Sequence, residues 1–373
     1  MFIDVIEFKS KSIKLSITLE QQKDNYHNIN FNAILDKFDY QYFDFAIYAV
    51  LPVAMRIGEN IKTNLPVTSK CIDFAQKTSR AWHYFLENHF QSVQIVSQSV
   101  VENPKYNQKN PRNSLSCFTG GIDSSYAFFK KFIEKGKQSD CLTIKGMDYK
   151  FSNDNGFESA LKHVEKAVER LFNKRIAVGT DLYDFYKKFN CNPSKAHITH
   201  IFSLFSVSLL FENKYTFLEI AADHTLVEQY FLHPYGSNCA TNELMKAAGM
   251  EIKNLGLEAS RPEKVKYLLE NNYDFSTLSF CVDTSIRPKN CGKCAKCIRT
   301  KVAFFACKAS NEILMQIFID PLLPKNWFRY LPKNKLNDKA YIKSLIEFIT
   351  YKNATVPEIE EAKNFNAECI LDD

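Results

Sequence analysis

A run of seven residues between two apolar stretches has the composition of an anion-binding turn. Residues Thr119 to Ser125 read TGGIDSS, with two adjacent glycines, an aspartate and two serines. Glycine tolerates positive φ and has no side chain to obstruct a ligand, so the backbone N–H groups of such a turn can face an anion. The hydroxyls of Thr119, Ser124 and Ser125 add further donors. We therefore predict that this turn binds phosphate groups.

Asp123 is the unusual member of this turn, because a carboxylate repels phosphate. A Mg²⁺ ion between the two removes the conflict, since Mg²⁺ prefers one or two carboxylates together with phosphate oxygens. The turn matches neither G-x-x-x-x-G-K-[ST] nor G-x-G-x-x-G, so the common phosphate loops are excluded. A simpler alternative is a strand-to-helix turn in which Asp123 or Ser124 only caps the helix.

Four cysteines form a second group with metal-ligand spacing. Cys281, Cys291, Cys294 and Cys297 are separated by nine, two and two residues. Three thiolates of C-x-x-C-x-x-C can converge on one ion, with Cys281 as the fourth ligand, which predicts structural Zn²⁺; an iron–sulfur cluster is the alternative. The negative charge of the thiolates would be offset by nearby cations, namely Arg287, Lys289, Lys293, Lys296 and Arg299.

Residues 221–249 follow an expected strand at 215–222. They should therefore lie at the carboxyl edge of the sheet, where α/β proteins bind ligands. The candidate substrate contacts in this segment are Asp223, His224, Glu228, His233 and Asn238. The alternative is that the two histidines, His224 and His233, only stabilise the loop.

Residues 258–270 predict a helix with Ser260 as its N-cap and Glu263 completing a capping box. Arg261 and Lys264 then fall in the first turn, where the helix dipole disfavours cations but an anion would be bound well. We therefore expect both cations to act together with Asp123 as catalytic residues.

Strand-like and helix-like segments alternate from residue 114 onward, as expected of an α/β domain with a doubly wound parallel sheet. The expected strands are 114–118, 141–147, 175–180 and 215–222, and the expected helices are 124–136, 156–172 and 197–211. This order places the glycine turn between the first strand and the first helix, which is the context that a phosphate site requires.

Three regions are expected along the chain. Residues 1–112 predict a smaller N-terminal α+β domain, with strands near 2–8, 14–19 and 92–101 and helical material near 42–55 and 71–86. The polar segment 102–113 marks its boundary. Residues 113–307 would form the domain with the glycine turn and the cysteines, and residues 308–373 a helical extension.

Composition places the chain among globular proteins, with 45% hydrophobic and 24% charged residues in 373. The net charge of +6 is modest and the lysines are scattered, which does not favour nucleic-acid binding. No apolar stretch reaches the length of a membrane span, and the N-terminus does not resemble a secretory signal. We expect a cytoplasmic protein with no membrane partner.

The glycine turn resembles the S-G-G-x-D-S signature of the PP-loop ATP pyrophosphatases, with Thr119 in place of the first serine. The resemblance implies an adenine nucleotide α-hydrolase-like fold that splits ATP between its α and β phosphates and transfers AMP to an oxygen. ATP and Mg²⁺ are then the expected ligands. The residues that would hold the departing pyrophosphate are Thr119, Gly120, Gly121, Asp123, Ser124 and Ser125.

The same turn followed by C-x9-C-x2-C-x2-C and Arg299 is similar to the 7-cyano-7-deazaguanine synthases of queuosine-precursor biosynthesis, over residues 114–305. That resemblance implies a carbon–nitrogen ligase that adenylates 7-carboxy-7-deazaguanine and combines it with ammonia, with structural zinc. Residues 1–112 and the tail lie outside it. Synthase-like proteins of bacterial antiviral operons resemble this longer arrangement, and they attach a deazaguanine to the N-terminal amine of a partner protein.

The acceptor is therefore left open among ammonia, a small amine and a protein, and a homodimer is compatible with the sequence. A second hypothesis is PP-loop tRNA thiolation, which needs a persulfide on a cysteine such as Cys191 or Cys239. A third is a scaffold protein that binds nucleotide without catalysis.

Overall fold

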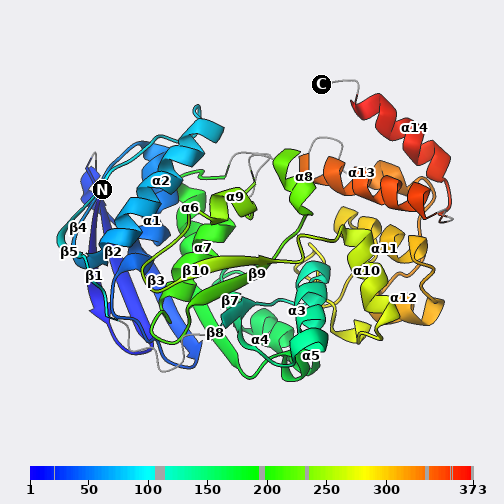
Figure 1. Cartoon of the computed structure of the whole chain (residues 1–373), viewed down its shortest axis with the longest axis horizontal. Coiled ribbons are helices and arrows are strands. Elements are labelled where there is room, and N and C mark those ends of the chain that lie inside the picture. The colour runs from blue at the N-terminus through cyan, green and yellow to red at the C-terminus, as the bar shows by residue number, and fades with distance from the viewer. Residues whose placement is uncertain are drawn as a thin grey trace.

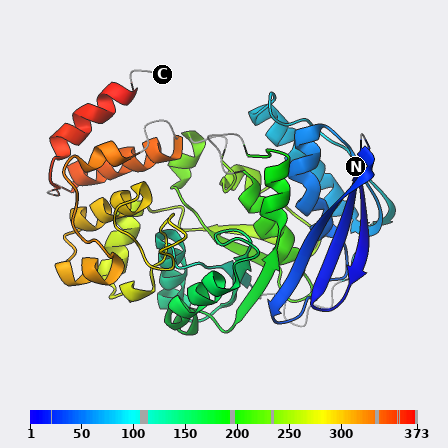
Figure 2. The ribbon, with the colours of Figure 1, turned by 180° about the vertical axis from the view of Figure 1, so that it is seen from behind.

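The computed structural model describes residues 1–20, 22–105, 114–192, 198–231, 235–331, 336–352, 354 and 356–370. These residues form an α/β structure around a ten-stranded sheet, ordered β10-β9-β6-β7-β8-β3-β2-β1-β4-β5. The N-terminal strands lie at one end of the molecule and the C-terminal helices at the other (Figure 1). The view from behind shows the same separation (Figure 2).

The N-terminal part is a three-stranded antiparallel meander followed by two parallel strands. Its elements are β1 (Phe2–Phe8), β2 (Ser12–Leu19), β3 (Gln22–Leu35), α1 (Asp44–Ile57), β4 (Ile61–Thr68), α2 (Ser69–Phe85) and β5 (Ile95–Val101). Buried Ile13, Leu15 and Ile17 alternate with less buried residues along β2, so one face of the meander packs on the core.

The central part alternates strands and helices. Its elements are β6 (Ser114–Cys117), α3 (Ile122–Lys135), β7 (Ser139–Lys145), α4 (Asp154–His163), α5 (Glu165–Leu171), β8 (Arg175–Thr180), α6 (Leu182–Lys188), α7 (Thr199–Leu209), β9 (Phe217–Ala221), α8 (Leu226–Phe231), α9 (Cys239–Asn242) and β10 (Glu251–Leu255). The five strands β10-β9-β6-β7-β8 pair in parallel.

The C-terminal part is helical, as expected. Its elements are α10 (Arg261–Glu270), η1 (Phe275–Thr277), α11 (Ala295–Ala306), α12 (Asn311–Ile317), η2 (Trp327–Tyr330), α13 (Leu336–Tyr351) and α14 (Ile359–Ile370). The longest helix described in the chain has 17 residues. Among the described residues, no helix combines the length and the apolar character that a bilayer crossing requires.

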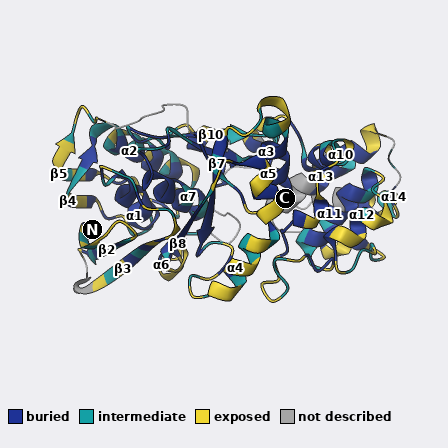
Figure 3. Cartoon of the chain, turned by 90° about the horizontal axis from the view of Figure 1, so that it is seen from below, coloured by how far each residue is buried: buried dark blue, intermediate teal, exposed yellow. Residues whose placement is uncertain are grey.

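Two hydrophobic cores stabilise this arrangement. The first contains the inner face of the meander and reaches across the sheet to residues of α7, such as Phe202 and Phe205. The second joins α3 and α5 to the C-terminal helices through residues such as Phe129, Leu268 and Trp327. Most of α1 and α7 is buried, whereas α4 exposes much of its surface (Figure 3).

The α/β class is confirmed, but the sheet is mixed rather than wholly parallel. Six of its nine pairings are parallel, and the pairings β1–β2, β2–β3 and β3–β8 are antiparallel. Strand β3 pairs with β8, with Phe31 opposite Thr180, so one sheet crosses the boundary expected near residue 112. The expected helix 156–172 was wrong as a single element, because it is interrupted at Val164.

Candidate functional site

The glycine turn lies where the strand order reverses. From β6 the chain proceeds to β7 and β8 on one side, and it later returns to β9 and β10 on the other side. The loops that leave the carboxyl ends of β6 and β9 therefore run in opposite directions, and such a switch point is where open α/β sheets generally bind ligands. The turn follows β6, and residues 222–225 follow β9.

Gly120 is required by the close packing of the turn. Its φ is +79°, and an added Cβ would lie 2.7 Å from Val164 Cγ1 and 2.9 Å from the Thr277 carbonyl oxygen. The Gly120 carbonyl accepts a hydrogen bond from the Ser279 N–H at 2.8 Å. The backbone of the turn is therefore supported by residues 277–279, which lie far away in sequence.

The simpler capping role for Asp123 or Ser124 is not what the structure contains. Helix α3 has Gly121 at its N-cap, with no side-chain hydrogen bond there. The Ser124 hydroxyl instead donates to the Gly121 carbonyl at 3.1 Å, and Ser125 accepts from the Tyr273 hydroxyl at 3.0 Å. The first N–H groups of α3 therefore have no side-chain cap at the N-cap, as an anion site requires.

An ion-pair cluster lies beside the turn. It joins Asp123 to Arg261 and Lys264, which are 138 and 141 residues further along the chain. Arg261 donates to one carboxylate oxygen of Asp123, and Lys264 Nζ lies 3.1 Å from the other. Lys264 also donates to the Ala222 carbonyl at the end of β9, at 2.6 Å. The side chains of Asp123, Arg261 and Lys264 are only 12%, 8% and 0% exposed.

The two cations decide the ionisation of Asp123. Burial alone would raise the pKa of this carboxyl, but the charges of Arg261 and Lys264 outweigh burial and lower the pKa well below its usual range. Asp123 is therefore a carboxylate at neutral pH. The expected capping box is present at the start of α10, where the Ser260 N–H donates to Glu263 at 2.8 Å, so the cations extend from a fixed helix end.

Lys296 also lies near charged side chains. Burial lowers the pKa of its partly buried ammonium, Asp148 opposes that shift, and the guanidinium groups of Arg299, Arg261 and Arg287 add to it. Arg287 is itself paired with Asp148, at 3.1 Å.

A pocket next to Thr119 combines aromatic and polar walls. Tyr149, Phe157, Ser279 and Arg287 line it together with Thr119. The Arg287 guanidinium lies 5.5 Å from the centre of the Tyr149 ring. The cavity measures about 20 Å³, which is room for about one water molecule and not for an aromatic ligand.

The substrate residues expected after β9 bind mostly to their own loop. Asp223 accepts a hydrogen bond from the Tyr235 hydroxyl. The Glu228 carboxylate accepts a hydrogen bond from the Thr225 N–H at 2.7 Å, at the start of α8. The same carboxylate lies 3.7 Å from Nδ1 of the buried His224. The Asn238 side chain donates to the Gln229 carbonyl and accepts from the Ala240 N–H. These contacts stabilise the loop after β9, so the substrate role of these residues stays a prediction, and His233 lies outside the described residues.

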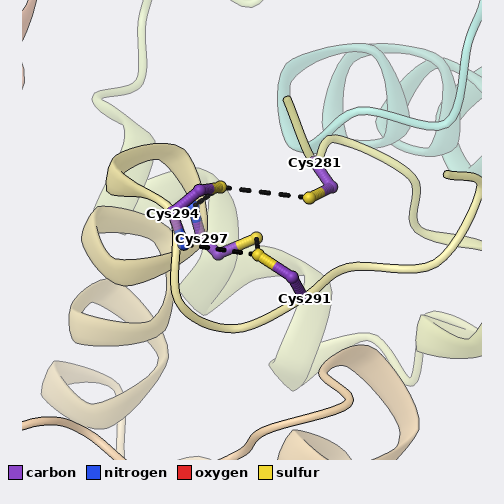
Figure 4. A group of neighbouring side chains, drawn as sticks. All are labelled: Cys281, Cys291, Cys294 and Cys297. Atoms are coloured by element: carbon purple, nitrogen blue, oxygen red, sulfur yellow. Dashed lines mark hydrogen bonds between the residues drawn. The ribbon is translucent and has the colours of Figure 1, made fainter. Parts of the chain in front are cut away.

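The four cysteines converge on one point (Figure 4). Their sulfur atoms all lie within 4.8 Å of one another, with 3.9 Å between Cys281 and Cys294 and 3.8 Å between Cys291 and Cys297. Tetrahedral zinc with bonds of about 2.3 Å requires sulfur atoms about 3.8 Å apart. This cluster could therefore hold a metal ion such as zinc.

Backbone amides stabilise the thiolates. The N–H groups of Lys293 and Cys294 each point to Cys291 Sγ at 3.3 Å, and the Cys297 N–H points to Cys294 Sγ at 3.5 Å. Hydrogen bonding with the Cys297 thiol is the main cause that lowers the pKa of Cys294 to about 4. A thiolate is the form of cysteine that binds zinc.

Lys301 stabilises the loop 291–297, which carries three of the four cysteines. Its fully buried ammonium donates to the carbonyls of Gly292, Asp320 and Leu322 at 2.8, 2.7 and 2.6 Å. Gly292 has φ +78°, and an added Cβ would lie 2.0 Å from the Asp320 carbonyl oxygen. Sequence reasoning missed Lys301, because its three acceptors come from two separate segments.

The cysteine cluster is also connected to the glycine turn. The Asn290 amide accepts from the N–H groups of Phe280 and Cys281 and donates to the Leu278 carbonyl. Residue 279 lies inside this segment and donates to Gly120. A metal that orders the cysteines would therefore also order the support of the turn.

The two cysteines of the thiolation hypothesis differ in position. Cys191 belongs to the first core, and burial raises its pKa to about 12. Cys239 begins α9 and is partly buried, and burial also raises its pKa. The charge of Arg56 favours the Cys191 thiolate, but burial outweighs it. The charge near Cys239 is that of Glu243, which raises the pKa further. Neither position therefore favours a nucleophilic thiolate.

Comparison with protein-family models, with curated proteins and with solved structures finds no match for this chain. A function must therefore be inferred from the glycine turn at the switch point of the sheet, the ion pairs of Asp123 and the four converging cysteines.

Proposed function

We propose that this protein is an ATP-dependent carbon–nitrogen ligase that releases AMP and pyrophosphate. It would activate a carboxylate of the 7-carboxy-7-deazaguanine kind and pass the acyl group to ammonia or an amine. The observation that carries this proposal is the group of Asp123, Arg261 and Lys264 beside the glycine turn, at the carboxyl ends of β6 and β9. The sequence resemblance to the deazaguanine synthases supports the substrate class.

The turn and the start of α3 would bind the pyrophosphate part of ATP. Gly120 and Gly121 present backbone without side chains, and the uncapped N–H groups of α3 point to the same place. Arg261 and Lys264 would share their charge between Asp123 and the phosphate oxygens. Their donors stabilise the negative charge that grows on the leaving pyrophosphate.

Asp123 fits a role as a ligand of Mg²⁺. It is ionised, and it lies at the start of the helix that would bind the phosphates. Bound Mg²⁺ would neutralise phosphate charge in this site. The two cations that now pair with Asp123 keep its carboxylate in place until nucleotide and metal arrive.

The proposed reaction has two steps. A substrate carboxylate oxygen attacks the α-phosphorus of ATP, the bond to the β-phosphate oxygen breaks, and pyrophosphate leaves. The amine nitrogen then attacks the acyl carbon, AMP leaves with the former carboxylate oxygen, and the nitrogen loses a proton to solvent. Adenylation is needed because oxide is too poor a leaving group for the amine to displace. The four cysteines would hold zinc as a structural ion.

The decisive experiment supplies the purified protein with ATP, Mg²⁺ and 7-carboxy-7-deazaguanine, with and without ammonia, and measures AMP and pyrophosphate. We expect AMP release that depends on the carboxylate and falls at least about 100-fold in Asp123→Asn. Glu158→Gln, an exposed substitution on α4, is the matched control and should keep full activity. Absence of AMP with every acceptor, or full activity of Asp123→Asn, contradicts the proposal.

A further inference from the structure

An ion pair between Arg287 and Asp148 forms part of the wall of the cavity beside Thr119. Arg287 belongs to the segment between Cys281 and Cys291, and Asp148 belongs to the loop that follows β7. Arg287 Nη1 lies 3.1 Å from a carboxylate oxygen of Asp148 and donates a hydrogen bond to the Asp148 carbonyl at 3.2 Å. The pair therefore connects the cysteine segment to a loop at the carboxyl end of the sheet.

The guanidinium of Arg287 uses only part of its donor capacity. Both of its contacts with Asp148 are made by Nη1. The Arg287 side chain is only 9% exposed, and its buried Nε has no hydrogen-bond acceptor among the described residues. A buried donor without an acceptor is unfavourable, and in a folded protein it usually indicates a bound water molecule or ion. Arg287 therefore has a donor available for an oxygen of a ligand.

Asp148 is a weak partner for this guanidinium. Its side chain is 44% exposed, and an ion pair open to solvent contributes little to stability. A guanidinium binds a carboxylate or a phosphate most strongly when two of its N–H groups face two oxygens of the anion. A ligand with two free oxygens would therefore pair better with Arg287 than Asp148 does. Such an anion would take the place of the Asp148 carboxylate, so it does not have to fit inside the cavity of about 20 Å³.

Arg287 is also held close to the glycine turn. Arg287, Ser279 and Thr119 line the same cavity, and the Ser279 N–H donates to the Gly120 carbonyl at 2.8 Å. An anion bound to Arg287 would therefore lie beside the turn that is expected to bind phosphate. The sequence had suggested only that Arg287 offsets the charge of the cysteines.

We propose that Arg287 binds an oxyanion of a ligand held at the glycine turn, and that Asp148 is the internal carboxylate which this oxyanion displaces. The inference rests on the proposed function and adds a binding residue to it. The oxyanion is the carboxylate of the substrate or a phosphate of ATP, because both offer two oxygens to a guanidinium. The two residues then have opposite effects, since Arg287 binds the ligand and Asp148 competes with it.

Calorimetric titration of the purified protein with ATP and Mg²⁺, and separately with 7-carboxy-7-deazaguanine, tests this exchange. For one of the two ligands, Arg287→Met should weaken binding at least about tenfold, because a charged hydrogen bond is lost. Asp148→Asn should tighten binding of the same ligand about two- to fivefold, because the competing carboxylate is removed. An effect on ATP assigns the anion to a phosphate, and an effect on the deazaguanine assigns it to the carboxylate.

Two controls separate this exchange from a general change of charge. The Arg175–Glu165 pair has similar exposures, 8% and 48%, but neither residue lines the cavity. Glu165→Gln removes the same charge as Asp148→Asn and should leave both affinities unchanged. In the Arg287→Met background, Asp148→Asn should bring no gain, since the two residues act through one contact. Poor folding of Arg287→Met cannot imitate the tighter binding expected of Asp148→Asn.

Two results would overturn the role of Arg287 alone. One is equal affinity of the wild type, Arg287→Met and Asp148→Asn for both ligands, in a wild-type protein that forms AMP. The other is a gain from Asp148→Asn that persists in the Arg287→Met background. A wild-type protein that binds neither ligand contradicts the proposed function together with this inference.

Discussion

Three buried carboxylates of this protein differ in their surroundings and therefore in their ionisation. Burial raises the pKa of Asp44 to about 6 and that of Glu212 to about 8, and the two charges also oppose each other. Asp123 is buried as well, but Arg261 and Lys264 reverse the effect of burial on its pKa. The partner of a buried carboxylate, rather than its burial, thus distinguishes a candidate ligand of a metal from an acid of the core.

Glu212 makes stability depend on pH. Its ordinary pKa is 4.5 and its pKa in the folded chain is about 8, so the folded state retains the proton to higher pH. The contribution of Glu212 to the free energy of unfolding is complete below pH 4.5 and is lost as pH rises toward 8. Glu212→Gln keeps an oxygen that can accept from the N–H groups of Gln41 and Tyr42, and it does not titrate.

Chemical unfolding at several pH values measures this effect. Between about pH 5 and pH 8 the wild type should lose roughly 2 to 4 kcal/mol more than Glu212→Gln. Glu243→Gln, where the side chain is 67% exposed, should follow the wild-type curve. Parallel curves for the wild type and Glu212→Gln would show that Glu212 is ionised in the folded protein.

At the scale of elements, α11 positions the loop that carries three of the four cysteines. The Lys301 ammonium, in this helix, donates a hydrogen bond to each of three carbonyl oxygens. Without it these buried carbonyls would lose their donor, which is unfavourable. One of them belongs to Gly292, inside the metal-binding loop. Lys301 would therefore act on a bound metal by positioning the loop, because its three hydrogen bonds go to backbone carbonyls and not to the cysteine sulfur atoms.

Lys301→Met should weaken metal binding without removing a ligand. We expect zinc to transfer to a competing chelator about ten times faster or more than from the wild type, because the loop is less well ordered. Lys293→Met is the matched control. Lys293 lies in the same loop and 3.7 Å from Asp320, but its side chain is 77% exposed. Equal release from both variants would contradict this role of Lys301.

Local sequence patterns predicted the strands and helices that carry the candidate site. They did not predict contacts between residues that are far apart in the sequence. Residues 175–180 form the predicted strand, and the capping box at Ser260 is present. The mismatch between the helix dipole and Arg261 suggested a phosphate near the start of α10. The anion that the structure places beside Arg261 is the Asp123 carboxylate, and the phosphate role stays a prediction. The strands β3, β4 and β10 were missed, because asparagines and a proline interrupt their apolar patterns.

On the scale of the whole molecule, the cysteine cluster connects the second core to the glycine turn. The Asn290 amide fixes residues 278–281, and the Ser279 N–H donates to Gly120. The first core contains no member of this connection. Loss of the metal should therefore affect the two cores unequally.

Hydrogen exchange after removal of zinc by a chelator tests this inequality. Residues 278–281 and the glycine turn should lose protection, whereas α1 and the meander should keep it. Restored protection on addition of zinc would show that the loss is reversible. Uniform loss over both cores would mean that the metal stabilises the molecule as a single unit instead.

The pairing of β3 with β8 has a consequence for synthesis on the ribosome. Leu35 ends β3 and Arg175 begins β8, so 140 residues separate them. Synthesis adds about 5 to 20 residues per second, so β8 is made roughly 7 to 28 s after β3, and during this time β3 has no strand on that edge. Asn28, Asn30 and Asn32 alternate with buried residues along β3 and keep its other face polar during this delay. Translation speed through residues 36–180 should therefore influence how much of the newly made chain stays out of aggregates.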